Sequence, residues 1–424
     1  MAATTATTES LLAERRQLAA GSGYLAGPLL IFGAIVLVAT AAIWGWTLDE
    51  SPRFWHAYML NVAYVASLSV GGLFFVIALH LFGARWGATV RRLVEAVAGT
   101  MPAVFLLFVP IAGVLAAGNT DLYPWSDPGF LAREAVVQAK TLYLNTEFFL
   151  IRTAIYLGIW LGLVALFNGT SLRQDETGDV QQLRRLQRYS GPGMLLFALT
   201  LNFAAFDWLM SLDPVWFSTI FGVYYWAGGV VGLLATVIIT AYVLQARGVM
   251  TQSITTEHYH DLSKLMFALT VFWGYSAFSQ FLLIWYANIP EETGWYALRQ
   301  PGGPTYFGMS TMTGALFVVH LFVPFLGFMS RKLRRNKHVM VAWAGYMLAV
   351  HWFDLFYVVM PTLQLYNFRD GVDHAAFPIG LPELLCAVGC VAIFLGWLIR
   401  NLNGIFLMPI RDPRVNEALS YHNA

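Results

Sequence analysis

The residues best placed for chemistry are two histidines and an aspartate inside long apolar segments. His351 and Asp354 are three positions apart in the stretch Val339–Met360, so a helix would place them on one face. His320 lies at nearly the same depth in the stretch Gly308–Met329. Imidazole titrates near neutrality and a carboxyl can take or release the same proton, so the three groups could exchange one. The alternative is that they form interhelical hydrogen bonds that only fix packing.

Other charged residues could extend such a proton path towards the membrane surfaces. Asp261 and Lys264 open one apolar segment on one side of the membrane, whereas Asp207, Glu147 and Arg152 lie towards the other side. An ionisable side chain deep in a membrane is costly, so a functional role is the first hypothesis for it. Asp261, Lys264 and Glu147 lie near segment ends, and for these three we favour a packing role.

Asp207 and Asp354 occupy the same sequence frame. The pattern Phe-Asp-x6-Pro describes both FDWLMSLDP and FDLFYVVMP, each late in an apolar run. A second, weaker match aligns FWHAYMLNVAYVASLSVG with VWFSTIFGVYYWAGGVVG and pairs Trp, Val, Tyr and Gly residues in register. Together the matches predict an internal repeat of four helices, whose copies are related by an axis along the membrane normal.

The composition indicates the elements that hold these residues. The 424 residues are 58% hydrophobic and 12% charged, with a mean hydropathy of +0.60, and soluble proteins carry about twice that charged fraction. We therefore predict an all-α integral membrane protein with ten spans of about 20 residues or more. The spans are expected at Tyr24–Trp46, Trp55–Phe82, Leu93–Ala117, Glu147–Phe167, Gly191–Ser211, Phe217–Gln245, Leu262–Ala287, Gly308–Met329, Val339–Met360 and Leu381–Ile399.

The predicted spans divide the chain into six parts. These are a cytoplasmic leader (1–22), a peripheral span (23–46), two four-helix bundles (54–211 and 216–361), a second peripheral span (378–400) and a cytoplasmic tail (401–424).

Two of the connections between spans are long. The connection Gly118–Thr146 contains two X-Pro steps and then a helical pattern that could lie along the membrane surface. The connection Asn168–Tyr189 mixes acidic and basic residues, and we predict a solvated connector there.

The basic residues predict the orientation. With a cytoplasmic N-terminus, only five of the 25 Lys and Arg residues fall in the outer segments, namely Arg53, Arg133, Lys140, Arg299 and Arg369. The positive-inside rule then places both termini in the cytoplasm. A net charge of +1 with scattered basic residues gives no indication of nucleic-acid binding.

Polar residues of the seventh span suggest a second kind of site. Tyr275, Ser276, Ser279 and Gln280 follow one another closely there, and the last three share a helix face. Such side chains can bind water or a quinone carbonyl, although interhelical hydrogen bonds are the more ordinary explanation. The sequence carries no nucleotide-binding loop, haem-attachment motif or metal-spaced His and Cys cluster, so we predict no covalently bound cofactor and no metal site.

Two cysteines lie in the last span. Cys386 and Cys390 are one helical turn apart, where a disulfide is geometrically awkward, and we predict that both are free apolar side chains.

Three segments resemble a known family of membrane subunits. HDLSKLMFALTVFWGYSAFSQFLLIWYANIPEET (His260–Thr293), DWLMSLDPVWFSTIFGVYYWAGG (Asp207–Gly229) and HWFDLFYVVMP (His351–Pro361) resemble the NrfD-like, or polysulfide-reductase-like, subunits. The similarity is to the smaller of the two such subunits, ActF, of bacterial alternative complex III, and WYANIPEET is its most specific part. It covers nearly all ten spans and implies two four-helix bundles with two peripheral helices.

The resemblance also implies a cellular role. Alternative complex III is a quinol:electron-acceptor oxidoreductase of the bacterial inner membrane. Its other parts are a larger NrfD-like subunit, an iron–sulfur subunit, haem c subunits and small membrane subunits. The larger NrfD-like subunit is expected to oxidise quinol, and the smaller one to carry protons without catalytic residues or a redox centre of its own.

Two alternatives remain open at this level. The chain could be the quinone- or menaquinone-binding subunit, with Tyr275, Ser276, Gln280 and His351 as contacts. It could also be an independent secondary transporter. Against the transporter, no pair of spans shows the Gly/Pro interruptions expected around a substrate site, although Pro102 and Pro110 should kink the third span.

Overall fold

The structure is a computed structural model that describes residues 17–18, 21–47, 50–299, 311–371 and 379–419. The described residues are almost entirely helical and include no β-strand. Ten helical segments are long and apolar enough to cross a membrane, which confirms the predicted number. They are Gly23–Thr47, Ser51–Leu81, Arg91–Ala116, Thr146–Thr177, Val180–Leu212, Phe221–Ala246, Thr256–Ala287, Met312–Met329, Lys337–Arg369 and Leu381–Leu402.

Nine spans are built mainly from the longer helices, and the eighth is built from the short helices α13 and α14 with a π-helical segment between them. Short helices also lie in the connections between spans. The longer ones are α2 (Ala26–Thr40), α3 (Ser51–Leu81), α4 (Arg91–Ala98), α5 (Met101–Ala116), α8 (Thr146–Thr177), α9 (Val180–Trp208), α10 (Phe221–Ala246), α11 (Thr256–Ala287), α16 (Lys337–Val359) and α18 (Leu381–Leu402). The shorter ones are α6 (Pro128–Arg133), α7 (Ala135–Gln138), α12 (Pro290–Leu298), α13 (Thr311–Phe317), α14 (Val323–Met329), α15 (Arg331–Arg334), α17 (Leu365–Arg369) and α19 (Val415–Leu419). Two π-helical segments, η2 (Ala41–Thr47) and η6 (Val318–Phe322), lie in the first and eighth spans.

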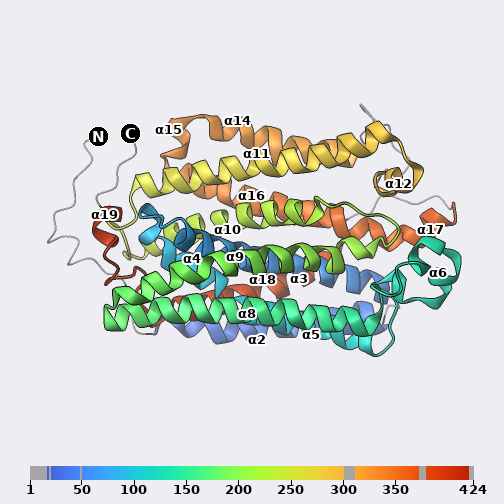
Figure 1. The fold of residues 1–424 in the computed structure, drawn as a ribbon, viewed down its shortest axis with the longest axis horizontal. Helices are drawn as coiled ribbons and strands as arrows, with labels where there is room; N and C mark the ends of the chain where they lie inside the picture. The colour runs from blue at the N-terminus through green and yellow to red at the C-terminus, as the bar shows by residue number, and fades with distance from the viewer. Residues whose placement is uncertain (1–16, 19–20, 48–49, 300–310, 372–378, 420–424) are drawn as a thin grey trace.

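The long helices run side by side along the molecule, with α3 and α10 at the centre (Figure 1). α3 packs against α4, α9, α10, α16 and α18, whereas α2 and α18 pack together at the periphery. Glycines bring α3 and α10 into backbone contact, because a Cβ at Gly71 would lie 2.6 Å from the carbonyl oxygen of Gly229. Small residues at a crossing allow this close approach, which drives helix association where lipid replaces water.

The third span is interrupted. α4 ends at Ala98 and α5 begins at Met101, and the hydroxyl of Thr100 between them bonds Ser69 of α3 at 2.7 Å. The span is therefore broken at Gly99 and Thr100, just before Pro102, while α5 continues through Pro110. Pro102 is the second residue of α5, where its missing N–H has no helical partner to lose.

The segment Asn168–Tyr189, predicted as a solvated connector, is mostly exposed but is helical over most of its length. α8 continues to Thr177 and α9 starts at Val180, so only Gly178 and Asp179 connect the two helices. Gly178 ends α8 with a φ of +70°, and the carboxylate of Asp179 accepts from the backbone N–H of Gln181 at 2.8 Å. The charged residues continue both helices beyond the apolar spans, because mixed charges suit a helix as well as a loop.

The connection Gly118–Thr146 contains the short helices α6 and α7, in agreement with its helical pattern. These helices lie at the same end of the molecule as α12 and α17, whereas α15 and α19 lie at the opposite end (Figure 1). The predicted leader, residues 1–22, lies largely outside the described residues. Cys386 and Cys390 are free and buried, as predicted.

Candidate functional site

His320, His351 and Asp354 come together in the interior of the bundle. α16 carries His351 and Asp354, and its start at Lys337 is fixed by Asn336, whose side chain accepts from the N–H groups of the first helical turn. η6 carries His320. All three side chains are buried. The face shared by His351 and Asp354 follows from their spacing in the sequence, as expected.

The carboxyl group of Asp354 is held by two neutral donors from other helices. The hydroxyl of Tyr224 on α10 donates to Oδ1. The indole N–H of Trp273 on α11 donates to Oδ2 at 3.0 Å. The Nδ1 atoms of His320 and His351 both lie 3.9 Å from the same Oδ2. One carboxylate oxygen thus faces two imidazoles.

His351 is fixed through its other ring nitrogen. Its Nε2 lies 2.8 Å from Oγ of Ser67 on α3, and that hydroxyl donates to the carbonyl of Tyr64 at 2.7 Å. In the tautomer that carries its proton on Nε2, the ring of His351 donates to this hydroxyl. That neutral tautomer turns an unprotonated Nδ1 towards Asp354. Gly228 of α10 makes room for this ring, since a Cβ there would lie 2.8 Å from Nδ1.

His320 approaches the same carboxylate oxygen from the eighth span. Its ring stacks on Trp273, with 3.7 Å between ring centroids and 28° between planes. Neither of its ring nitrogens has a hydrogen-bond partner among the described residues. The π-helical turn η6 presents this side chain, and such turns are frequent at functional sites.

The three side chains lie too far apart for direct proton transfer. A separation of 3.9 Å exceeds hydrogen-bond range, so exchange between Asp354 and either imidazole needs one bridging water or an approach of about 1 Å. The unprotonated Nδ1 of His351 can accept a proton from Oδ2 of Asp354 and return it. His320 offers a second acceptor for the same oxygen.

Asp207 has a different environment. Arg152 of α8 binds both of its carboxylate oxygens, at 2.8 and 2.9 Å, and the hydroxyl of Tyr156 donates to Oδ2 at 2.8 Å. Arg152 also donates to the carbonyl of Tyr143 at 2.9 Å and stacks over its ring. A bidentate ion pair fixes the charge of both partners, so this cluster is suited to hold helices together.

The two aspartates nevertheless share a layout. Asp207 on the fifth span faces Arg152 on the fourth, and Asp354 on the ninth span faces His320 on the eighth. In each case a basic side chain on one span approaches a carboxyl on the next. The difference is chemical, because guanidinium keeps its proton whereas imidazole can accept and release one.

The remaining predicted path residues lie elsewhere. Asp261 and Lys264 form an ion pair at 3.0 Å near the start of α11, about 18 Å along that helix from Trp273. Glu147 lies in the first turn of α8 and is exposed. The structure thus brings Arg152 to Asp207 and His320 to Asp354 and His351, and places Asp261, Lys264 and Glu147 at helix ends.

The predicted quinone contacts on α11 differ in exposure. Tyr275 is 63% exposed, whereas Ser276 and Gln280 are buried. Ser276 bonds the carbonyl of Phe272 at 3.0 Å, and Gln280 accepts from Ser218 at 2.8 Å. Quinone binding by these residues stays a prediction.

Sequence analysis missed a buried ionic network near the other end of the bundle. Arg91 lies 3.2 Å from Glu95 and 2.6 Å from Asp412, which belongs to the tail. Arg92 also binds Glu95, at 2.7 Å, and contacts Asp175 of α8. The sequence analysis used the basic residues only to predict membrane orientation, so it did not identify the ion pairs of Arg91 and Arg92. The Arg-Arg-x-x-Glu spacing, which permits i,i+3 and i,i+4 pairs, was the available signal.

Asp412 fastens the tail to this network. Burial opposes its charged form, but hydrogen bonds from Arg414 and the charge of Arg91 outweigh that effect and hold the pKa of Asp412 well below its usual range. The carboxylate stays ionised at neutral pH and ties the tail to α4.

Comparisons with protein-family models and with curated proteins give no match. Among the described residues, no group of three or more His, Cys, Asp or Glu side chains could hold a metal ion.

Proposed function

We propose that this chain is a proton-conducting membrane subunit of a quinol:electron-acceptor oxidoreductase, with Asp354, His351 and His320 as its proton-exchanging centre. The observation that carries the proposal is the convergence of two imidazole Nδ1 atoms on one buried carboxylate oxygen, each at 3.9 Å. Membership of a quinol-oxidising complex rests on the sequence resemblance described above.

In this proposal the chain itself performs no redox chemistry. Tyr224 and Trp273 hold the carboxylate of Asp354, and Ser67 orients His351, so proton affinity is set by fixed neighbours. A proton passes between Asp354 and Nδ1 of His351 or His320. Quinol oxidation in a neighbouring subunit drives the transfer if it changes the proton affinity of one of these groups, because coupling between two sites is reciprocal.

The proposal includes the two four-helix units and cytoplasmic termini. In its support, α3 packs against α4, α5, α8 and α9, and α10 packs against α11 and α16. The basic helix α15 lies at the same end of the molecule as α19, which follows the last span (Figure 1). This agrees with the positive-inside assignment of that end to the cytoplasm.

Proton counting in the reconstituted complex tests the centre. Asp354→Asn should lower the number of protons released per electron, because an amide cannot release a proton, while Asp354→Glu should retain more of it. The matched control is Thr270→Val, which alters a buried hydroxyl about one helical turn from Trp273. Within the described part of the chain, this hydroxyl bonds the carbonyl of Met266 in its own helix. Unchanged turnover and unchanged proton stoichiometry in Asp354→Asn would refute the relay.

Purification from the native membrane tests the complex separately. We expect iron–sulfur and haem c proteins to accompany the chain. An active carrier isolated as this chain alone would instead establish the transporter alternative.

A further inference from the structure

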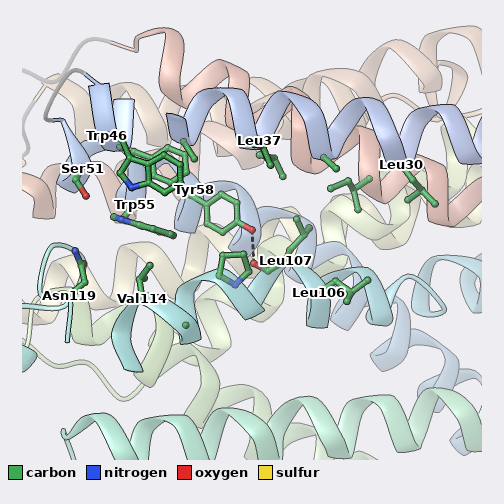
Figure 2. A pocket seen from close by; sticks show the side chains of 18 of the residues that line it. Leu30, Leu37, Trp46, Ser51, Trp55, Tyr58, Leu106, Leu107, Val114 and Asn119 are labelled. Carbon is green, nitrogen blue, oxygen red and sulfur yellow. Dashed lines mark hydrogen bonds between the residues drawn. The ribbon is translucent and has the colours of Figure 1, made fainter. Parts of the chain in front are cut away.

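A long apolar groove lies between the peripheral helix α2 and the central helices (Figure 2). It is bounded by α2, η2, α3, α5 and α18 and has a volume of about 900 Å³. Leu30 and Trp46 mark its two ends on the α2 side, about 24 Å apart along the helix. None of its lining residues carries a charge.

The groove opens sideways into the bilayer. Trp46 at one end is 81% exposed, and Val38 and Leu106 along its rims are also exposed. An alkyl chain is a single file of carbon atoms about 4 Å wide, which the groove accommodates.

The end of the groove near Trp46 carries polar groups. Ser51 and Asn119 line it there (Figure 2). Both donate to the same Oδ2 of Asp121, at 2.5 and 2.8 Å. Glu50 precedes Ser51, is exposed and lies 3.9 Å from Arg53, which also pairs with Glu383 at 2.9 Å. One guanidinium thus offsets two carboxylates, and Asp121 adds a third carboxylate. This mouth therefore has an excess of negative charge. It would repel an anionic headgroup and attract an ammonium group.

We propose that the groove is a binding site for a phosphatidylethanolamine molecule. One acyl chain lies along the groove between α2 and α5, and the ammonium of the headgroup lies at the mouth formed by Asp121 and Glu50. The aromatic side chains of Trp46, Trp55 and Tyr58 flank the chain near the headgroup, as aromatic residues do at membrane interfaces. The lipid then fills the space between the peripheral pair and the bundle.

Filling the groove tests this site. Gly113 lines it, and a Cβ added there meets no heavy atom within 4 Å, so Gly113→Phe places a ring in the lipid position. Gly162 on α8 is equally open and lies outside the groove, which makes Gly162→Phe the matched control. After detergent extraction, native mass spectrometry should find phosphatidylethanolamine on the wild type and on the control. Gly113→Phe should retain about tenfold less, equivalent to about 1.4 kcal/mol of binding.

The headgroup is tested with Asp121→Asn, which should shift retention from phosphatidylethanolamine towards phosphatidylglycerol. Equal retention of phosphatidylethanolamine in the two glycine variants would overturn the proposal. So would a quinone that is lost only from Gly113→Phe, or loss of a partner subunit with unchanged lipid content.

Fluorescence quenching by a brominated lipid tests the site in the wild-type chain, so it does not depend on the folding of any variant. In phosphatidylglycerol vesicles doped with phosphatidylethanolamine brominated in its acyl chains, quenching of the groove tryptophans should saturate at a low mole fraction of the brominated lipid. Quenching that rises in proportion to the mole fraction indicates random contact with bulk lipid and overturns the site.

Discussion

Replacing Asp207 by asparagine should destabilise this protein strongly. Asparagine keeps the shape of the side chain but removes the charge that faces Arg152 at 2.8 and 2.9 Å. Both partners are buried, so the guanidinium would be left without its counter-charge. Breaking a buried ion pair from one side costs about 3–5 kcal/mol. We expect Asp207→Asn to lose this much unfolding free energy.

Replacing Asp354 by asparagine should lower the unfolding free energy by a smaller amount. The groups that donate to this carboxyl, Tyr224 and Trp273, are neutral, and the amide oxygen of asparagine can still accept from one or both. The expected loss is that of about one hydrogen bond, about 0.5–1.5 kcal/mol. The two aspartates thus provide a matched pair, in which identical chemistry has unequal consequences.

The assay is denaturant-induced unfolding in detergent, followed by tryptophan fluorescence. The double variant Asp207→Asn with Arg152→Met removes both members of the pair, and it should recover much of the stability lost by Asp207→Asn alone. Equal destabilisation at positions 207 and 354, or a double variant no more stable than Asp207→Asn, would show that the ion pair is not what stabilises this site.

Three further outcomes are expected. Gly228→Ala should lower the unfolding free energy by about 1–3 kcal/mol, because the new Cβ would lie 2.7 Å from Cε1 of His351. The displaced imidazole should also impair proton release. Thermal unfolding measures the first effect and proton counting the second. Tyr224→Phe should cost about 1–3 kcal/mol by removing a buried donor to Asp354, again measured by unfolding. The ionised carboxylate of Asp412 stabilises the fold at pH values above its unfolded pKa of about 3.9. This stabilisation is lost as the pH falls below that value towards the lower pKa of the folded state. Acidification should therefore lower the thermal midpoint of the wild type more than that of Asp412→Asn.

Each of these predictions has a control and a contradicting outcome. Gly345→Ala introduces a Cβ into open space on α16 and should change neither stability nor proton release. A loss at Gly345 as large as at Gly228 would mean that helix propensity, and not contact with His351, explains the effect. Wild-type stability for Tyr224→Phe would show that another donor replaces the hydroxyl. Parallel acid profiles for the wild type and Asp412→Asn would contradict the ionic attachment of the tail.

The sequence was sufficient for the spans because their signal is local. Each is a long apolar run, and the lipid requires a helix to satisfy its backbone. The helical structure of the α8–α9 connection was not predicted because charge content was given more weight than capping. Gly178 followed by Asp179 is a C-terminal stop next to an N-cap, and that pair would have indicated a tight hairpin.

The candidate site was predictable only where its members share a helix. His351 and Asp354 follow from their spacing in one segment. Tyr224, Trp273 and Ser67 come from three other helices, and in the sequence they look like ordinary aromatic and small residues of a membrane span. Which of them face Asp354 depends on helix rotation and packing, and hydropathy carries no information about either.

The ionic network around Arg91 has a consequence for handling the protein. Its charges are shielded from water, and ions in solution screen buried pairs far less than exposed ones. A concentrated salt wash should therefore leave the tail attached to α4. If such a wash changes the behaviour of the protein, the change reports on contacts with partners or lipid headgroups at its surface, and not on loosening of this chain.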